Sequence, residues 1–213
     1  CVQSFMLGII QGITEFLPIS STAHLKVIPY FLGLNDPGVS ISASLQLGSA
    51  FAIVFYFRNN ISVIISSFFS ILGHRKPFKD ENTTLATYIF LASIPILFLG
   101  LITKLYWSGY SYSHFRGLFS IALISIFMSI LLALSEIYGD KKKLFSDIKL
   151  RDIILLGFSQ ALAIFPGVSR SGVTLTSALF SGIERKTAAR LSFLVGIPAI
   201  SISGFIELLT LYR

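Results

Sequence analysis

The chain has 213 residues, of which 54% are apolar and only 13% are charged, and its mean hydropathy is +0.79. A soluble domain normally carries about 25% charged residues, so this composition indicates an integral membrane protein. The net charge of +7 does not favour a nucleic-acid partner, because the Lys and Arg residues lie in short clusters between long apolar runs. A single cysteine, Cys1, excludes a disulfide framework and a Cys-x-x-Cys metal site.

The first apolar run, residues 4–17, is shorter than the roughly 20 residues that a membrane-spanning helix requires. Pro18 interrupts this run, and the hydroxyl residues that follow it are good N-caps for a new helix. We therefore predict a re-entrant hairpin of two short helices, of which the second ends near Leu32. A turn-rich segment, Gly33 to Gly38, follows the hairpin.

Four later runs are predicted to span the membrane, namely residues 41–57, 84–105, 116–138 and 191–212. The run 61–73 is apolar but short, and it is predicted to lie along the membrane interface. A second re-entrant hairpin is predicted over residues 153–183, because Pro166 and Gly167 stop another run that is too short to span.

Charge predicts the orientation of these elements. Lys and Arg concentrate in four segments that the positive-inside rule places in the cytoplasm: residues 58–60, 74–82, 139–152 and 184–190. The aromatic, almost uncharged segment 106–115 is then outside. The first hairpin enters from the outer face and the second from the cytoplasmic face, which is an inverted arrangement.

An internal repeat in the sequence supports this inverted arrangement. Several residue pairs recur at one constant offset: Pro18 and Pro166, Ser21 and Ser169, Ser44 and Ser192, Gly48 and Gly196, and Phe57 and Phe205. One residue out of step, Leu7-Gly8-x-x-Gln11 matches Leu156-Gly157-x-x-Gln160. Inverted repeats with broken helices near the bilayer midplane are a known plan of membrane proteins.

The predicted fold is therefore an all-α polytopic membrane protein, with an inverted-topology repeat and two re-entrant helical hairpins that meet at mid-membrane. Residues 1–213 form a single membrane domain, with repeat 1 at about 1–148 and repeat 2 at about 149–213. Repeat partners of the spans 84–105 and 116–138 would fall beyond Arg213, so repeat 2 is expected to lack its last two helices.

Residues 11–24 gather polar groups in an otherwise apolar chain. Gln11 and Glu15 lie four residues apart and share a helix face. A carboxylate inside a bilayer is costly and usually functional, although a structural Glu bonded to a neighbouring helix is the alternative. The hydroxyl residues after Pro18 start a helix, where free backbone N–H groups favour an anion; simple N-capping is the alternative.

His24 follows Ser21 by three residues, so the two lie on adjacent turns of one helix face. Such a pair can act as base and nucleophile. The alternative is a histidine bonded to a backbone carbonyl. In the second break, Arg170 offers a planar fork of donors suited to phosphate, and glycines on either side let backbone approach a ligand. The alternative partner of Arg170 is Glu15, in a buried salt bridge.

At these residues the sequence resembles the undecaprenyl-pyrophosphate phosphatase family, known from bacitracin resistance. The resemblance rests on Gln11-x-x-x-Glu15, on Phe16-Leu17-Pro18-Ile19-Ser20-Ser21-Thr22-Ala23-His24, and on Pro166-Gly167-Val168-Ser169-Arg170-Ser171-Gly172. It extends through the chain to Gln46-Leu47-Gly48-Ser49 and Ser192-Phe193-Leu194.

The resemblance implies removal of the terminal phosphate from a C55 isoprenyl pyrophosphate, which recycles the lipid carrier of peptidoglycan synthesis in cell-wall biogenesis. It implies a divalent cation, Mg²⁺ or Ca²⁺, and a site that opens to the outer face of the bacterial cytoplasmic (inner) membrane. The implied partners are the prenyl pyrophosphate lipid and membrane lipids, and formation of a homodimer is left as an open alternative. A flippase that moves a polyprenyl phosphate without hydrolysis is the alternative function, since inverted repeats suit alternating access.

Roles carry over by motif. Glu15, Ser21, His24 and Arg170 are implied to be catalytic, with Ser21 as the nucleophile, although His24 could instead activate a water. The phosphate pocket is implied to be lined by Ser20, Thr22, Ser169, Arg170 and Ser171. Glu15 and Gln11 are the candidate metal ligands, and Gln11 takes the neutral option of a motif position that can also be Glu.

Overall fold

The structure is a computed structural model that describes residues 2–73, 78–106 and 114–211. In these residues the regular elements are helices, which confirms the all-α prediction, and the only β-type contact among them is an isolated bridge between Lys143 and Ile183. The α-helices are α1 (Val2–Thr14), α2 (Ser21–Phe31), α3 (Gly38–Tyr56), α4 (Arg58–Leu72), α5 (Glu81–Tyr106), α6 (Leu118–Tyr138), α7 (Leu150–Ala161), α8 (Arg170–Phe180) and α9 (Arg185–Leu211). The described residues also contain three short 3₁₀ turns: η2 (His114–Arg116), η3 (Phe145–Asp147) and η4 (Leu162–Ile164).

Three of the described helices, α5, α6 and α9, are each long and apolar enough to cross a membrane. They correspond to the predicted spans 84–105, 116–138 and 191–212. The bent pair α3–α4 raises this number to four if the pair is one span. The chain is therefore a multi-pass membrane protein. Most of the aromatic segment predicted to lie outside, and part of the basic loop after α4, fall outside the described residues.

The predicted loop at 58–60 is wrong, because Phe57 alone separates α3 from α4. The chain has no Pro or Gly here to stop a helix, so backbone hydrogen bonds continue from Phe57 to Ile53 and from Ile61 to Phe57. The helix axis nevertheless turns by 87° at this point. A turn of this size fits the prediction that residues 61–73 do not cross.

The predicted loop at 184–190 is also wrong, because α9 begins at Arg185. Residues 185–190 are good helix formers, and Glu184 starts the helix: its carbonyl accepts from the backbone N–H of Ala188 (2.8 Å), and its carboxylate accepts from the hydroxyl of Thr187 (2.9 Å). Charged turns at the end of a spanning helix can project into water, so charge alone does not mark where such a helix begins.

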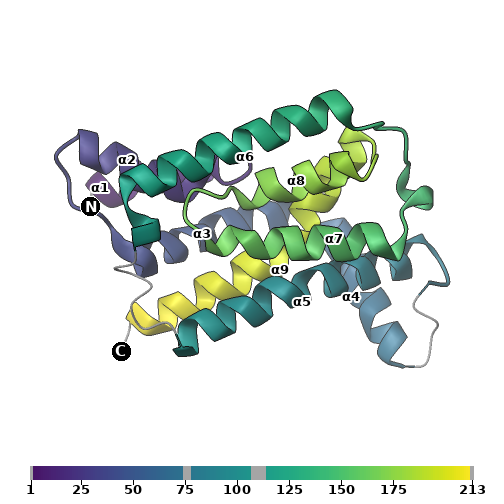
Figure 1. Cartoon of the computed structure of the whole chain (residues 1–213). Helices are drawn as coiled ribbons and strands as arrows, with labels where there is room; N and C mark the ends of the chain where they lie inside the picture. Colours follow the sequence, from purple (N-terminus) through teal and green to yellow (C-terminus); the bar gives the residue numbers. More distant parts are fainter. Residues whose placement is uncertain (1, 74–77, 107–113, 212–213) are drawn as a thin grey trace.

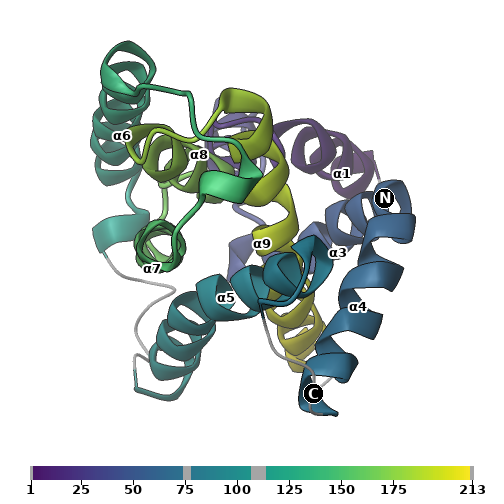
Figure 2. The same cartoon turned by 90° about the vertical axis from the view of Figure 1, so that its right-hand side faces the viewer.

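The helices are arranged around α9, which packs along α3 on one side and against α5 and α8 on others (Figures 1 and 2). α7 packs against α5, and α6 packs against α8. The main apolar core lies among α5, α7, α8 and α9, where Ile153, Leu156, Leu179 and Val195 are fully buried. This core fixes the α7–α8 hairpin in place, and with it the second break.

Candidate active site

The first break lies between α1 and α2, where Glu15 to Ile19 form turns. Ser20 ends the break with a φ of 63°, a left-handed conformation that costs a non-glycine residue about 1–2 kcal/mol. This conformation aims the Ser20 side chain back at the new helix, where its hydroxyl oxygen accepts from the backbone N–H of Ala23 (3.4 Å). The N-cap prediction for this segment is thus confirmed at Ser20.

The second break follows η4 and contains Pro166 and Gly167. Gly167 has a φ of 97°, and a Cβ atom there would lie 2.8 Å from the carbonyl oxygen of Ile121 in α6. Only glycine fits both constraints. Ser169 then caps α8, because its hydroxyl oxygen accepts from the backbone N–H of Gly172 (3.2 Å).

The two breaks are in contact, as the sequence predicts. The hydroxyl of Ser171 donates to the carbonyl of Leu17 (3.0 Å), and the hydroxyl of Ser169 lies 3.5 Å from the same oxygen. A Cβ atom on Gly172 would lie 3.4 Å from Cβ of Pro18. Carbonyl groups freed by the first break are therefore satisfied by hydroxyls of the second. The depth of this contact in a bilayer stays a prediction.

Glu15 lies at the centre of the contact and is 7% exposed. Its Oε1 accepts from Nη2 of Arg170 (2.9 Å), and its Oε2 accepts from Nε2 of Gln11 (2.7 Å) and from the hydroxyl of Ser21 (2.6 Å). Three groups from three helices thus converge on one carboxylate. The Glu15–Arg170 salt bridge, given above as the alternative for Arg170, is the pairing that this structure contains.

The salt bridge to Glu15 uses Nη2 of Arg170 and leaves the other terminal nitrogen of the side chain without a partner among the described residues. Its Nη1 is buried and has no hydrogen-bond partner. The guanidinium lies against Gly196 of α9, where a Cβ atom would fall 1.5 Å from Nη1. Sequence reasoning noted Gly196 only as a repeat match of Gly48 and missed this role. A buried donor without a partner costs free energy, so Nη1 is a candidate hydrogen-bond donor to a bound anion.

His24 and Thr22 lie near this centre but do not contact the carboxylate of Glu15. Nδ1 of His24 is 2.9 Å from the carbonyl oxygen of Ser20, so this nitrogen carries a hydrogen and donates it to that carbonyl, and Nε2 takes no part in this contact. Among the hydrogen bonds of the described residues, none joins His24 to Ser21. Thr22 is half-buried in the first turn of α2.

The donor set can be tested for a divalent cation. Within the described residues, no three His, Cys, Asp or Glu side chains cluster as in an all-protein metal site. However, Oε1 of Gln11 is buried without a partner beside the Glu15 carboxylate. Mg²⁺ is usually held by one or two protein oxygen ligands together with substrate phosphates, so these residues fit a cation that is shared with the substrate.

Comparisons with known proteins place the chain. Residues 4–213 match the family described as bacitracin resistance protein BacA. An undecaprenyl-diphosphatase of Prochlorococcus marinus strain NATL1A is 72% identical over 213 residues, which are 100% of this chain and 76% of that protein. An undecaprenyl-diphosphatase of Prochlorococcus marinus strain MIT 9313 is 47% identical over 208 residues, covering 98% of this chain and 69% of that protein. An undecaprenyl-diphosphatase of Synechococcus sp. strain WH7803 is 47% identical over 206 residues, covering 97% of this chain and 72% of that protein. The chain therefore belongs to the bacitracin resistance protein BacA family.

Proposed function

We propose that this protein hydrolyses undecaprenyl pyrophosphate to undecaprenyl phosphate and inorganic phosphate. The observation that carries the proposal is the 2.9 Å contact between Glu15 and Arg170, which joins the two polar motifs of an apolar chain into one site. A relative that is 72% identical over the whole chain is named undecaprenyl-diphosphatase, and this name supports the same substrate class here.

Ser21 is the proposed nucleophile. Its hydroxyl donates to Glu15 at 2.6 Å, so Glu15 is within reach to accept the proton as Ser21 attacks the terminal phosphorus. A Ser21–phosphorus bond forms, and the bond from that phosphorus to the bridging oxygen breaks, which releases undecaprenyl phosphate. Water then cleaves the phosphoserine. The sequence assigned the role of base to His24, whereas the contact of Ser21 favours Glu15.

His24 keeps a role in this scheme through its free Nε2. Because Nδ1 faces the carbonyl of Ser20, Nε2 can accept a proton from the water that cleaves the phosphoserine. The same atom could activate water for a direct attack on the substrate, which is the alternative route. Trapping of phosphate on Ser21 during turnover distinguishes the two routes, because only the first forms that bond.

Arg170 and the helix starts of α2 and α8 supply positive charge for the pyrophosphate. The free Nη1 of Arg170 is the proposed first contact, after which the guanidinium exchanges Glu15 for substrate oxygens. Ser20, Thr22, Ser169 and Ser171 are proposed to line the phosphate pocket. Such fixed donors stabilise charge on the departing lipid phosphate.

We propose Glu15 and Oε1 of Gln11 as the protein ligands of a divalent cation, Mg²⁺ or Ca²⁺. When bound, the cation would neutralise part of the negative charge of the pyrophosphate. The orphaned oxygen of Gln11 supports this assignment.

We further propose that α1–α2 and α7–α8 are re-entrant hairpins of an inverted repeat within one membrane domain. The two breaks would meet near mid-membrane, in a site that opens to the outer face of the bacterial cytoplasmic membrane. Support comes from the distribution of Lys and Arg and from the contact between the breaks at Ser171 and Leu17.

The test is phosphate release from a prenyl pyrophosphate by the protein in membranes with Mg²⁺. Glu15→Ala and Arg170→Ala are expected to lower the rate by at least about 100-fold, because each removes a charge from the reacting centre. Lys104→Ala is the control, since Lys104 pairs with Glu207 at 2.9 Å outside this centre. Activity that survives in both site variants, or movement of intact lipid without phosphate release, contradicts the proposal.

Either single variant leaves a buried charge unpaired and can unfold the protein. The double variant Glu15→Gln/Arg170→Gln removes both charges at similar size, so it is expected to recover stability without recovering activity. Thermal unfolding of all three variants in detergent separates loss of the fold from loss of chemistry.

A further inference from the structure

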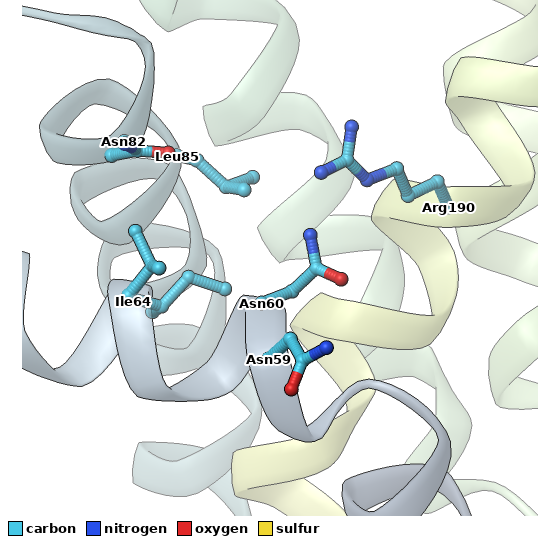
Figure 3. A pocket seen from close by; sticks show the side chains of 7 residues that line it. Asn59, Asn60, Ile64, Asn82, Leu85 and Arg190 are labelled. Carbon is cyan, nitrogen blue, oxygen red and sulfur yellow. The ribbon is translucent and has the colours of Figure 1, made fainter.

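A cavity of about 240 Å³ lies between α4, α5 and α9. Its polar lining consists of Asn59 and Asn60 from α4, Asn82 from α5 and Arg190 from α9, and its apolar wall includes Ile64 and Leu85. Figure 3 shows Arg190 and Asn60 pointing toward one another across this space.

The cavity is separate from the Glu15–Arg170 centre. Arg190 precedes Gly196 by six residues on α9, which is roughly 9 Å along the helix axis and on a different face. Residues of the proposed catalytic centre are absent from the lining. The inference below therefore does not depend on the proposed hydrolysis.

The positive charge of Arg190 is not balanced by a carboxylate among the described residues that line the cavity. The Arg190 side chain is exposed and takes no part in an ion pair or side-chain hydrogen bond within the described part of the chain, whereas the Arg185 side chain on the same helix pairs with Glu136. No Asp or Glu occurs among the described residues that line the cavity. A guanidinium and three carboxamides without a carboxylate form a donor-rich site that is suited to an anion.

The position of the cavity at the ends of two helices indicates which class of anion can reach it. Asn59 and Asn60 lie in the first turn of α4, directly after the 87° turn of the chain, and Asn82 lies in the first turn of α5. Helix ends with Lys and Arg nearby mark the level of lipid headgroups. The apolar side chains of Ile64 and Leu85 line the same cavity, so it can accommodate a phosphate group with or without an attached apolar part.

We propose that this cavity binds a phosphate group, with the Arg190 guanidinium and the Asn60 carboxamide as its main donors. Arg forms paired hydrogen bonds with phosphate oxygens, and the Asn60 amide faces the same space. Two sources can present this group at the cavity: the headgroup of an anionic phospholipid, or free inorganic phosphate.

The test uses the intact protein in detergent with two probes, phosphatidylglycerol and inorganic phosphate. Native mass spectrometry measures retained lipid, and calorimetry measures phosphate binding. Arg190→Gln and Asn60→Asp are each expected to lower the affinity for whichever of the two probes the unaltered protein binds by at least about tenfold. Arg190→Gln removes the cation of the site, and Asn60→Asp places a carboxylate beside that cation. Lys186→Gln is the control, since it removes one exposed positive charge from the same end of α9.

The two probes identify the source. Arg190-dependent binding of phosphatidylglycerol assigns the site to a lipid headgroup, and Arg190-dependent binding of inorganic phosphate alone assigns it to free phosphate. The proposal is overturned if Arg190→Gln and Asn60→Asp bind both probes as the unaltered protein does, or if Lys186→Gln weakens binding equally. Unchanged melting temperatures of the variants show that the fold is intact.

Discussion

The two broken hairpins differ in how they are held, although their sequences follow one plan. α7 and α8 pack against α5, α6 and α9, and the buried face of each contributes to the main core. α1 packs against α2 and α3, and none of the residues of α1 or α2 that the structure describes belongs to that core. Both α1 and α7 expose apolar side chains on their other face, for example Phe5 and Phe158. The hairpin that carries the cation Arg170 is thus part of the main core, while the hairpin that carries Glu15, Ser21 and His24 packs outside it.

Matched glycines show the contrast directly. A Cβ atom on Gly157 of α7 would lie 2.9 Å from Cα of Ala92 in α5, because the two helices touch backbone to backbone. Its repeat match, Gly8 of α1, has nothing within 4 Å of that position. A repeat in sequence therefore does not ensure equivalent packing, and the two copies can tolerate different substitutions.

The largest expected effect comes from the matched serines Ser21 and Ser169. Ser21→Ala is expected to lower phosphate release by at least about 100-fold, because it removes the proposed nucleophile. The fold should survive, because Gln11 and Arg170 still pair with the Glu15 carboxylate. Ser169→Ala removes the cap of α8, so it is expected to cost about 1 kcal/mol of stability and less than tenfold in rate. Initial rates and melting temperatures measure both. Equal rate losses would mean that the hairpins share the chemistry evenly.

A smaller effect is expected from the matched glycines. Gly157→Ala inserts a methyl group into a backbone contact and is expected to destabilise the fold by about 1–3 kcal/mol. Gly8→Ala has room and gains helix propensity, so its stability should stay the same or rise by at most about 1 kcal/mol. Urea unfolding in mild detergent is the measurement. A destabilised Gly8→Ala would show that the face of α1 is packed in solution.

The smallest effect concerns Asp36, which follows α2 and pairs with Lys26 at 3.3 Å. Partial burial alone would raise the pKa of Asp36, but the backbone N–H of Gly38 and the Lys26 ammonium outweigh it and hold this pKa below its ordinary value. A depressed pKa means that the pair stabilises the fold above the ordinary carboxyl pKa of about 3.9, and that this contribution is lost as pH falls through the folded-state pKa. Asp36 is exposed and Lys26 is half-buried, so solvent screens the pair and its contribution stays below about 1 kcal/mol.

Asp36→Asn should therefore be slightly less stable than the unaltered protein at neutral pH, and the two melting temperatures should converge as the pH is lowered past the carboxyl range. A difference that persists in acid would assign the effect to packing rather than charge. This experiment examines the end of the first hairpin, which packs outside the main core.

Local sequence signals predicted the parts of the fold that depend on local chemistry. Pro18 and Pro166 marked both breaks, because proline cannot continue a helix, and serines marked the new helix starts. The meeting of the breaks followed from the presence of Arg170 in an apolar chain, since a buried cation needs an anionic partner. Fold class and site composition were therefore predictable.

Features that depend on packing between distant segments were not predictable. The turn at Phe57 contains no Pro or Gly that would mark it in the sequence, and the two helices that it joins pack on different partners, α3 on α9 and α4 on α5. The hydroxyl of Ser21 was expected to face His24, but the break turns it toward Glu15. Hydrogen-bond choice among groups a few ångströms apart depends on backbone geometry, which the spacing of residues in sequence does not specify.

The close approach of the Arg170 guanidinium to Gly196 is expected to couple the residues at these two positions in relatives of this protein. Because a Cβ atom at position 196 would overlap Nη1, a relative with a larger residue there must hold its arginine in another rotamer. The size of the residue at position 196 therefore predicts which rotamer the arginine adopts in each relative before substrate binds. A comparison of relatives sorted by this single position would show whether pairing with the carboxylate, or an arginine already turned toward the substrate, is the more common resting state.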